Sequence, residues 1–295
     1  MKKFIQYTLV CLGALAIVSC SKPASLKDDA PGEIKFNIGM AGTATKVTDY
    51  GFQIGDCIGL WAVERGDLGE QIPLQIGGNF INNEALTLQD ASNHWTGSRT
   101  LYWSSKPCDF YGLFPYQGSI VSIDEQPFSV SLDQSASANY IASDLLWASA
   151  SNVAYGQTVD LQFRHMMSKL SVVIVKGDDF EGEIPSDVTV HIYNTTTTGK
   201  VNIQNGSIEK DAFGAKGTIT SKKVSNQRFE TIVVPQFIEK KTPLIEVTMG
   251  GIAYLLEYSI SLRPGYEHTV YLTVNTSPDQ EMIEIGIDAQ SGGWN

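Results

Sequence analysis

Residues that could carry catalytic or metal chemistry are few in this chain and lie far apart in the sequence. No two of the four histidines have the spacing of zinc ligands, and they fall in different predicted strands and loops: His94, His165, His191 and His268. The sequence contains no HExxH, GxSxG, CxxC or glycine-rich phosphate motif. The carboxylates of residues 178–183 are interrupted by glycine, which is typical of a solvated loop and not of a glycosidase pair. The sequence therefore predicts no metal, no cofactor and no enzyme activity.

The cysteines leave two interpretations open. Cys11 lies in the N-terminal apolar segment, whereas Cys57 and Cys108 lie in apolar, strand-like runs. These last two could form a disulfide in an oxidising compartment, or each could be buried as a small hydrophobic residue. Their spacing matches no disulfide or metal motif, so burial is slightly favoured.

Cys20 follows an N-terminal segment with the features of an export signal. Lys2 and Lys3 begin it, residues 4–18 carry no charge, and Ile17-Val18-Ser19 directly precede the cysteine. This pattern resembles the lipobox of bacterial lipoproteins, which implies a thioether-linked lipid on Cys20 and cleavage before it. The alternative is an ordinary secretory signal, which needs no cysteine there. Residues 1–19 are predicted to be a lipoprotein signal peptide, too short for a membrane span of about 20 apolar residues.

Residues 20–32 are predicted to be a flexible tether, because they are rich in Ser, Pro, Lys and Asp and have no apolar period. Ser21, in place of aspartate, favours sorting to the outer membrane by resemblance to known lipoproteins. Residues 27–29 loosely resemble the acidic surface-export signals of Bacteroidetes lipoproteins. The expected location is therefore the cell surface, where the lipid would attach the protein to the outer membrane.

The composition limits the partners and the number of domains. The chain has 295 residues, 42% of them hydrophobic, and a formal net charge of −11. This length allows one large or two small domains. An acidic surface repels phosphates, so nucleic acid is not expected as a partner.

Many short strands with turn residues between them predict an all-β protein. Residues 34–40 alternate between apolar and polar positions, which indicates a half-buried strand. Short strands are also expected at 74–76 and 101–103, and a short helix within 135–150. Regular spacing of short strands indicates β-sandwiches. Two of them are predicted, at 33–167 and 168–295.

An aromatic cluster is the sharpest local feature of the sequence, and it has two interpretations. Its members are Trp95, Tyr102, Trp103, Phe110, Tyr111, Phe114 and Tyr116. They could form a stacking platform for sugars on a surface lipoprotein. Alternation along a strand also explains them as sandwich core, which we favour.

Four motifs, in this order after the lipobox, resemble the fimbrillin family of Bacteroidetes: GDCIGLWAV, TLYWSSKPCDFYGLFPY, SDLLWASA and LQFRHMMSKLSVVIV. The resemblance implies two β-sandwiches of transthyretin-like topology and a role as subunit, tip or anchor of a type V pilus. It also implies, for polymerising subunits, a cut at a basic residue that removes the first strand. The vacated groove would then accept a strand from a neighbouring subunit.

The residues of this chain offer candidates for each part of that exchange. Residues 34–40 are the candidate removable strand, and Lys46 in the loop GTATKVT is the candidate cut site, where the family commonly has arginine. Ile283, Ile285 and Ile287 alternate with polar residues or glycine, as a donor strand requires. Both terminal segments could equally pair within their own domains.

Two functions follow as expectations. The first is a structural pilus component whose partners are other pilus subunits, joined by donor-strand addition, with a host or bacterial surface ligand as a further partner. The alternative is an outer-membrane surface lipoprotein that binds glycan through Trp95, Trp103 and their neighbours.

Overall fold

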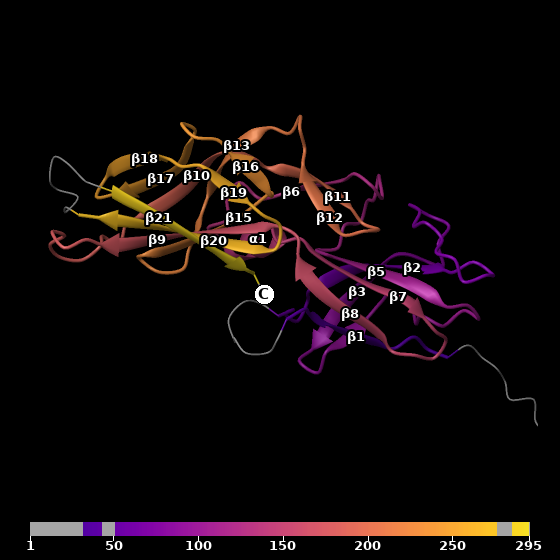
Figure 1. The fold of residues 1–295 in the computed structure, drawn as a ribbon. Coiled ribbons are helices and arrows are strands. Elements are labelled where there is room, and N and C mark those ends of the chain that lie inside the picture. The colour runs from indigo at the N-terminus through magenta and orange to yellow at the C-terminus, as the bar shows by residue number, and fades with distance from the viewer. Residues whose placement is uncertain (1–31, 43–50, 276–284, 295) are drawn as a thin grey trace, which may run out of the picture. The chain divides into compact units, whose positions relative to one another are not determined.

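The computed structural model describes residues 32–42, 51–275 and 285–294, with backbone only for 285–288. Nearly all of its regular elements are strands (Figure 1). The single helix among the described residues, α1 (Ser137–Ala142), is six residues long, and no helix there has the length and apolar character needed to cross a bilayer. The predicted all-β fold is confirmed, as is the short helix.

A seven-stranded sheet contains most of the strands before residue 166. Its order is β1-β8-β7-β5-β2-β3-β4. The bounds of these strands are β1 Phe36–Met40, β2 Cys57–Glu64, β3 Ile81–Asp90, β4 His94–Thr96, β5 Cys108–Phe114, β7 Leu146–Val153 and β8 Val159–His165. All neighbours pair antiparallel except β1, which runs parallel to β8.

The central strands of this sheet are buried on both faces. In β5, every residue is buried, and alternate side chains enter two separate apolar clusters. Phe110 and Phe114 join the cluster that contains β1, whereas Tyr111 and Leu113 join the larger cluster formed mainly with later strands. Strands covered on both faces have nearly continuous apolar sequences, which explains the run CDFYGLF.

The later strands form four further sheets. A five-stranded sheet has the order β14-β15-β9-β20-β21, and a four-stranded sheet has the order β13-β10-β17-β18. Smaller sheets consist of β12-β11-β6 and β16-β19. The bounds are β6 Gln126–Ser129, β9 Ser168–Lys176, β10 Thr189–Thr196, β11 Thr198–Asn202, β12 Ser207–Lys210, β13 Lys216–Thr220, β14 Lys222–Lys223, β15 Arg228–Val233, β16 Gln236–Ile238, β17 Pro243–Met249, β18 Ile252–Glu257, β19 Ile260–Leu262, β20 Tyr266–Val274 and β21 Ile285–Gly293.

Contacts far apart in sequence join the earlier and later strands. The chain passes from the seven-stranded sheet to the five-stranded sheet between His165 and Ser168, yet β6 pairs with β11. The indole N–H of Trp147 donates to the carbonyl of Ile203 at 2.7 Å. The fully buried carboxamide of Gln134 bonds both backbone groups of Ile232, each at 2.8 Å, and so occupies the place of a further strand beside β15.

Two of the expected short strands are absent. Residues 74–76 form no strand, because the N–H of Leu74 donates to the side chain of Gln204 and not to a backbone ladder. Around Leu101, pairing is limited to one isolated bridge between Glu33 and Tyr102. In runs of three residues, an apolar and polar alternation can arise because one side chain is buried, and it does not require backbone pairing with another strand.

Candidate functional site

The first strand, β1, lies at the edge of the seven-stranded sheet and contributes its apolar side to a core. Its parallel register with β8 runs from the pair Phe36–Val159 to the pair Met40–Phe163. Ile38 is buried, and the ring of Phe36 packs edge-on against Phe110 with centroids 6.2 Å apart. The alternation predicted for residues 34–40 is therefore confirmed.

The other backbone edge of β1 faces the opposite edge of the same sheet. The N–H of Ile34 donates to the carbonyl of Leu101 at 2.8 Å, and the side-chain amide of Asn93 donates to the carbonyl of Ile38 at 2.8 Å. Two surface grooves flank this edge of β1. One is lined by residues that include Met40, Phe52, Ile54 and Leu88, and the other by residues that include Phe36, Leu86, Trp95 and Leu101.

This arrangement makes β1 separable without breaking the sheet in its interior. An edge strand shares a ladder with one neighbour only, whereas removal of a central strand would split the sheet. Loss of β1 would uncover the apolar seats of Ile34, Phe36 and Ile38 together with the free backbone edge of β8. Such a groove fits an extended segment that has the same alternation.

The last strand, β21, is also an edge strand. It pairs antiparallel with β20 from the pair Tyr266–Gly293 to the pair Val274–Ile285, and it is outermost in the described five-stranded sheet (Figure 1). Ile285 and Ile287 thus have backbone partners within their own chain. Both terminal strands occupy edges, the positions from which a strand can be exchanged without breaking a sheet internally.

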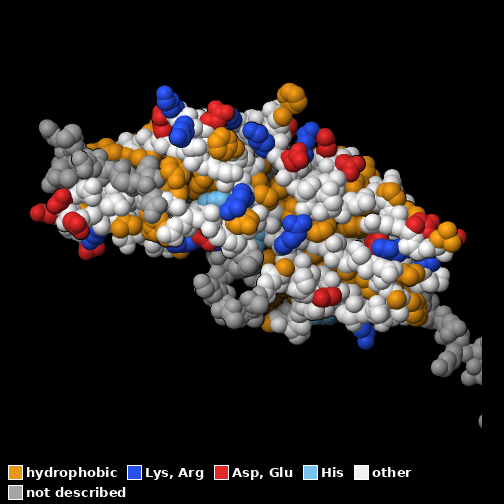
Figure 2. Space-filling model, viewed as in Figure 1, with side chains coloured by type: hydrophobic (Ala, Val, Ile, Leu, Met, Phe, Trp, Pro, Cys, Tyr) orange, Lys and Arg blue, Asp and Glu red, His pale blue; other side chains and the backbone are white. Residues whose placement is uncertain are grey.

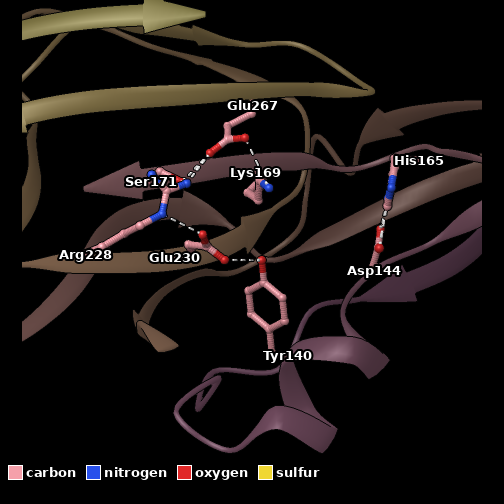
Figure 3. A network of polar contacts seen from close by, with 8 residues as sticks. All are labelled: Tyr140, Asp144, His165, Lys169, Ser171, Arg228, Glu230 and Glu267. Atoms are coloured by element: carbon pink, nitrogen blue, oxygen red, sulfur yellow. Dashed lines mark hydrogen bonds and ion pairs between the residues drawn. The ribbon is translucent and has the colours of Figure 1, made fainter. Parts of the chain in front are cut away.

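A network of charged side chains crosses the five-stranded sheet beside α1 (Figure 3). Glu267 lies at its centre: its carboxylate accepts from Arg228 Nη2 at 2.7 Å and from Ser171 Oγ at 2.8 Å, and lies 3.2 Å from Lys169 Nζ. Lys169 is only 1% exposed. Because a buried ammonium without a carboxylate is very costly, this pairing fixes how β9 and β20 lie against each other.

The network continues from β15 to the helix. Arg228 Nε donates to Glu230 at 2.9 Å, and the hydroxyl of Tyr140 on α1 donates to the same carboxylate at 3.2 Å. The ammonium of Lys222 lies 4.5 Å from the Tyr140 ring centroid. These contacts attach α1 to the sheet, which is a structural and not a catalytic arrangement.

Two groups in β20, the partly buried Glu267 and the buried His268, make the stability depend on pH. Burial opposes ionisation of Glu267, but Lys169, Ser171 and Arg228 hold the pKa of its carboxyl below the ordinary value of 4.5. Burial, with Arg263 nearby, lowers the pKa of His268 from its ordinary 6.5. In both cases the unfolded chain takes up the proton first as the pH falls, so both groups stabilise the fold at neutral pH and lose this effect on acidification.

We therefore expect the urea midpoint of unfolding to fall from pH 7 to pH 3. The part due to His268 is lost below about 6.5 and the part due to Glu267 below about 4.5, the ordinary values in the unfolded chain. Glu267→Gln should remove the second part and retain the first. Glu239→Gln, at an exposed position, is the matched control and should leave the profile unchanged. Identical profiles for the two variants would contradict this assignment.

The aromatic cluster proves to be mainly core. Trp103, Phe110, Tyr111 and Phe114 are buried, as the favoured interpretation predicted. Trp95 is partly buried, packed edge-on against Phe52 with its indole N–H donating to Asn93 at 2.7 Å, whereas Tyr102 and Tyr116 are exposed.

The remaining candidate residues are scattered. Cys57 is partly buried and Cys108 fully buried, and both are free thiols, with burial raising the pKa of Cys108 to about 11. Within the described part of the chain, no three His, Cys, Asp or Glu side chains come together to hold a metal. Cys20, Lys46 and Ile283 lie outside the described residues.

Sequence reasoning missed the charged network. Lys169 lies beside a nearly continuous apolar run and Glu267 almost a hundred residues later, so only the parallel register of β9 and β20 brings them opposite each other. A lysine within an apolar strand, which requires a buried partner, was the available signal. On the face seen in Figure 2, Lys and Arg side chains are mixed with Asp and Glu, without one continuous basic surface.

Solved structures define the class of fold first. A proposed cell adhesion protein from Bacteroides uniformis has a TM-score of 0.66 at 18% identity, over 90% of this chain and 98% of that one. Another from Bacteroides ovatus has a TM-score of 0.68 at 15% identity, with the same coverage of 90% and 98%. A fimbrial protein from Bacteroides ovatus has a TM-score of 0.50 at 17% identity, over 83% of this chain and 49% of that one. These similarities establish the fold.

The family follows from the sequence itself. The model of the fimbrillin-like family matches residues 45–289, and the chain belongs to this family. The resemblance read from the motifs is thereby confirmed, and the protein has a pilus-related structural role at fimbriae of the cell surface. A search of curated protein sequences finds no match.

Proposed function

We propose that this protein is a pilus component that joins other pilus subunits by strand exchange. The observation that carries the proposal is the position of β1: a parallel edge strand with one apolar side in a core and grooves along its free edge. Loss of this strand would leave a groove that a strand of a neighbouring subunit can fill. The role is non-catalytic, and a host or bacterial surface ligand remains a proposed partner.

We infer that the protein is exported as a lipoprotein attached to the outer membrane through Cys20. The leader 1–19 and the tether 20–32 support this attachment. The mature chain is proposed to have two domains, 33–167 and 168–295, and the passage of the chain between sheets after His165 supports their boundary. A cut after Lys46 would release β1 from polymerising subunits, because this residue lies between β1 and β2 in the sequence.

Sequencing the N-terminus of the protein from sheared surface filaments tests the proposal. Processed subunits should begin at Val47, and Lys46→Gln should abolish this start and reduce filament yield at least tenfold. Lys35→Gln, at an exposed position beside β1, is the matched control and should leave both unchanged. A lipid-blocked start at Cys20 throughout the filaments would instead identify an anchor that keeps β1.

The glycan-binding alternative has narrower support. Of its two named tryptophans, Trp103 is 3% exposed, whereas Trp95 lines a groove together with His94 and Arg99. A platform would therefore depend on Trp95 alone, with the polar side chains around it.

A further inference from the structure

The C-terminal strand ends in a buried tryptophan. Trp294, the residue that directly follows β21, is only 5% exposed. It contributes to a pocket whose other walls come from distant parts of the sequence: Gly51, Phe52, Gln53, Asp56, Phe114, Tyr140, Ile141, Asp144 and Leu146.

A stack of aromatic and charged groups surrounds the indole. Its ring lies on the imidazole of His165, with centroids 3.8 Å apart and planes 10° from parallel. Asp144 fixes that imidazole through Nδ1 at 2.9 Å, and Lys169 Nζ lies 5.2 Å from the indole centroid. The charged side chains of Asp144 and Lys169 thus fix the surroundings of the Trp294 indole. Lys169 also pairs with Glu267 in the network of Figure 3.

The backbone holds the same residue. The N–H of Trp294 donates to the carbonyl of Gly265, and the N–H of Gly265 donates to the carbonyl of Met167, both at 2.8 Å. Gly265 has a φ of +69°, and a β-carbon there would lie 3.1 Å from the carbonyl oxygen of His165. This glycine therefore lets the chain end approach the β8–β9 connection closely.

The three residues before the tryptophan hold the strand through the backbone ladder with β20 and through one side-chain hydrogen bond, which Arg263 Nη2 donates to Ser291 Oγ at 3.1 Å. Ser291, Gly292 and Gly293 are exposed, and two of them have no side chain to pack. Glycine also loses the most conformational freedom when it is ordered. An edge strand opens from its end, and Trp294 is the buried side chain that opposes fraying there, in addition to the backbone ladder and the Arg263–Ser291 bond.

We propose that Trp294 is the anchor that retains β21 in its own sheet and that its seat controls when the C-terminal strand is released to pair with a second copy of this chain. The second half of this statement rests on the proposed strand exchange, whereas the anchor does not. Release requires the indole to leave the His165 ring and the pocket before the ladder with β20 can open from its end.

Hydrogen exchange followed by mass spectrometry on the full mature chain, in monomeric form, tests the anchor. In Trp294→Ala, the amides of 285–293 should exchange at least tenfold faster than in the wild type, with those of β9 unchanged. Trp294→Phe, which keeps a ring over His165, should be intermediate. Gln290→Ala, exposed in the same strand, is the matched control and should exchange like the wild type.

Equal exchange in Trp294→Ala and Gln290→Ala would overturn the anchor, as would faster exchange throughout β9, which would indicate general destabilisation. The rate of filament formation is measured separately, on chains cut to begin at Val47, and should rise in Trp294→Ala. No filaments from any variant, wild type included, would count against strand exchange itself, and unchanged filament rates despite faster opening would overturn the control of release.

Discussion

Trp103→Ala should lower the free energy of unfolding by about 3–5 kcal/mol, which is typical for truncation of a buried large aromatic residue. Its indole is 3% exposed and packs edge-on against Phe110 at a centroid distance of 5.7 Å. The cavity would lie in the core to which β1 contributes, so the seats of Ile34 and Phe36 should loosen too. Urea unfolding followed by circular dichroism measures the loss.

Trp95→Ala is the comparison that distinguishes the two interpretations of the aromatic cluster, a protein core and a glycan-binding platform. Trp95 is only partly buried, so its truncation should cost about 1 kcal/mol. If the groove beside it binds glycan, this variant should lose retention on a glycan array while remaining folded. A Trp103→Ala protein of wild-type stability would contradict the core assignment.

Gly206→Ala should be destabilising by about 3 kcal/mol, because two effects coincide at this position. Gly206 has a φ of +64°, and a β-carbon there would lie 2.3 Å from the Trp147 ring. Arg164 also reaches this turn, since its Nη2 donates to the Gly206 carbonyl at 2.8 Å. The methyl group would therefore push the β11–β12 hairpin away from β7 and β8.

Gly156→Ala is the matched control for the backbone effect. Gly156 has a similar φ of +79°, but a β-carbon at this position would have no neighbouring atom within 4 Å. This variant should lose only about 1 kcal/mol through the left-handed conformation. Thermal melts of both variants measure the difference. Equal losses of stability would mean that the Trp147 ring can move aside for the new methyl group without destabilising the fold.

Strand alternation predicted much of this fold because it depends on neighbouring residues alone. The apolar side of β1 and the buried aromatic residues of β5 were accessible in this way. For β5, however, alternation predicted only one buried face. Both faces are buried, because a second set of strands covers the face that would otherwise meet solvent.

Contacts set by register could not be read from one sequence. The pocket of Trp294 joins the residue after β21 to His165 and Phe52, and no periodic pattern connects such distant positions. The same holds for β6, whose partner β11 lies about seventy residues later in the chain. Cys20 and Lys46 depend on recognition by other proteins, so their roles rest on motif resemblance.

The carboxamide of Gln134, which takes up both backbone groups of Ile232, has a consequence for how molecules of this chain meet in a crowded environment. Beyond the two-residue strand β14, the backbone of β15 is thereby occupied at Ile232 and offers no template there for uncontrolled lateral aggregation. In the proposed assembly by strand exchange, backbone pairing is thereby directed away from this stretch of β15, as an assembly that extends in one dimension and does not clump requires.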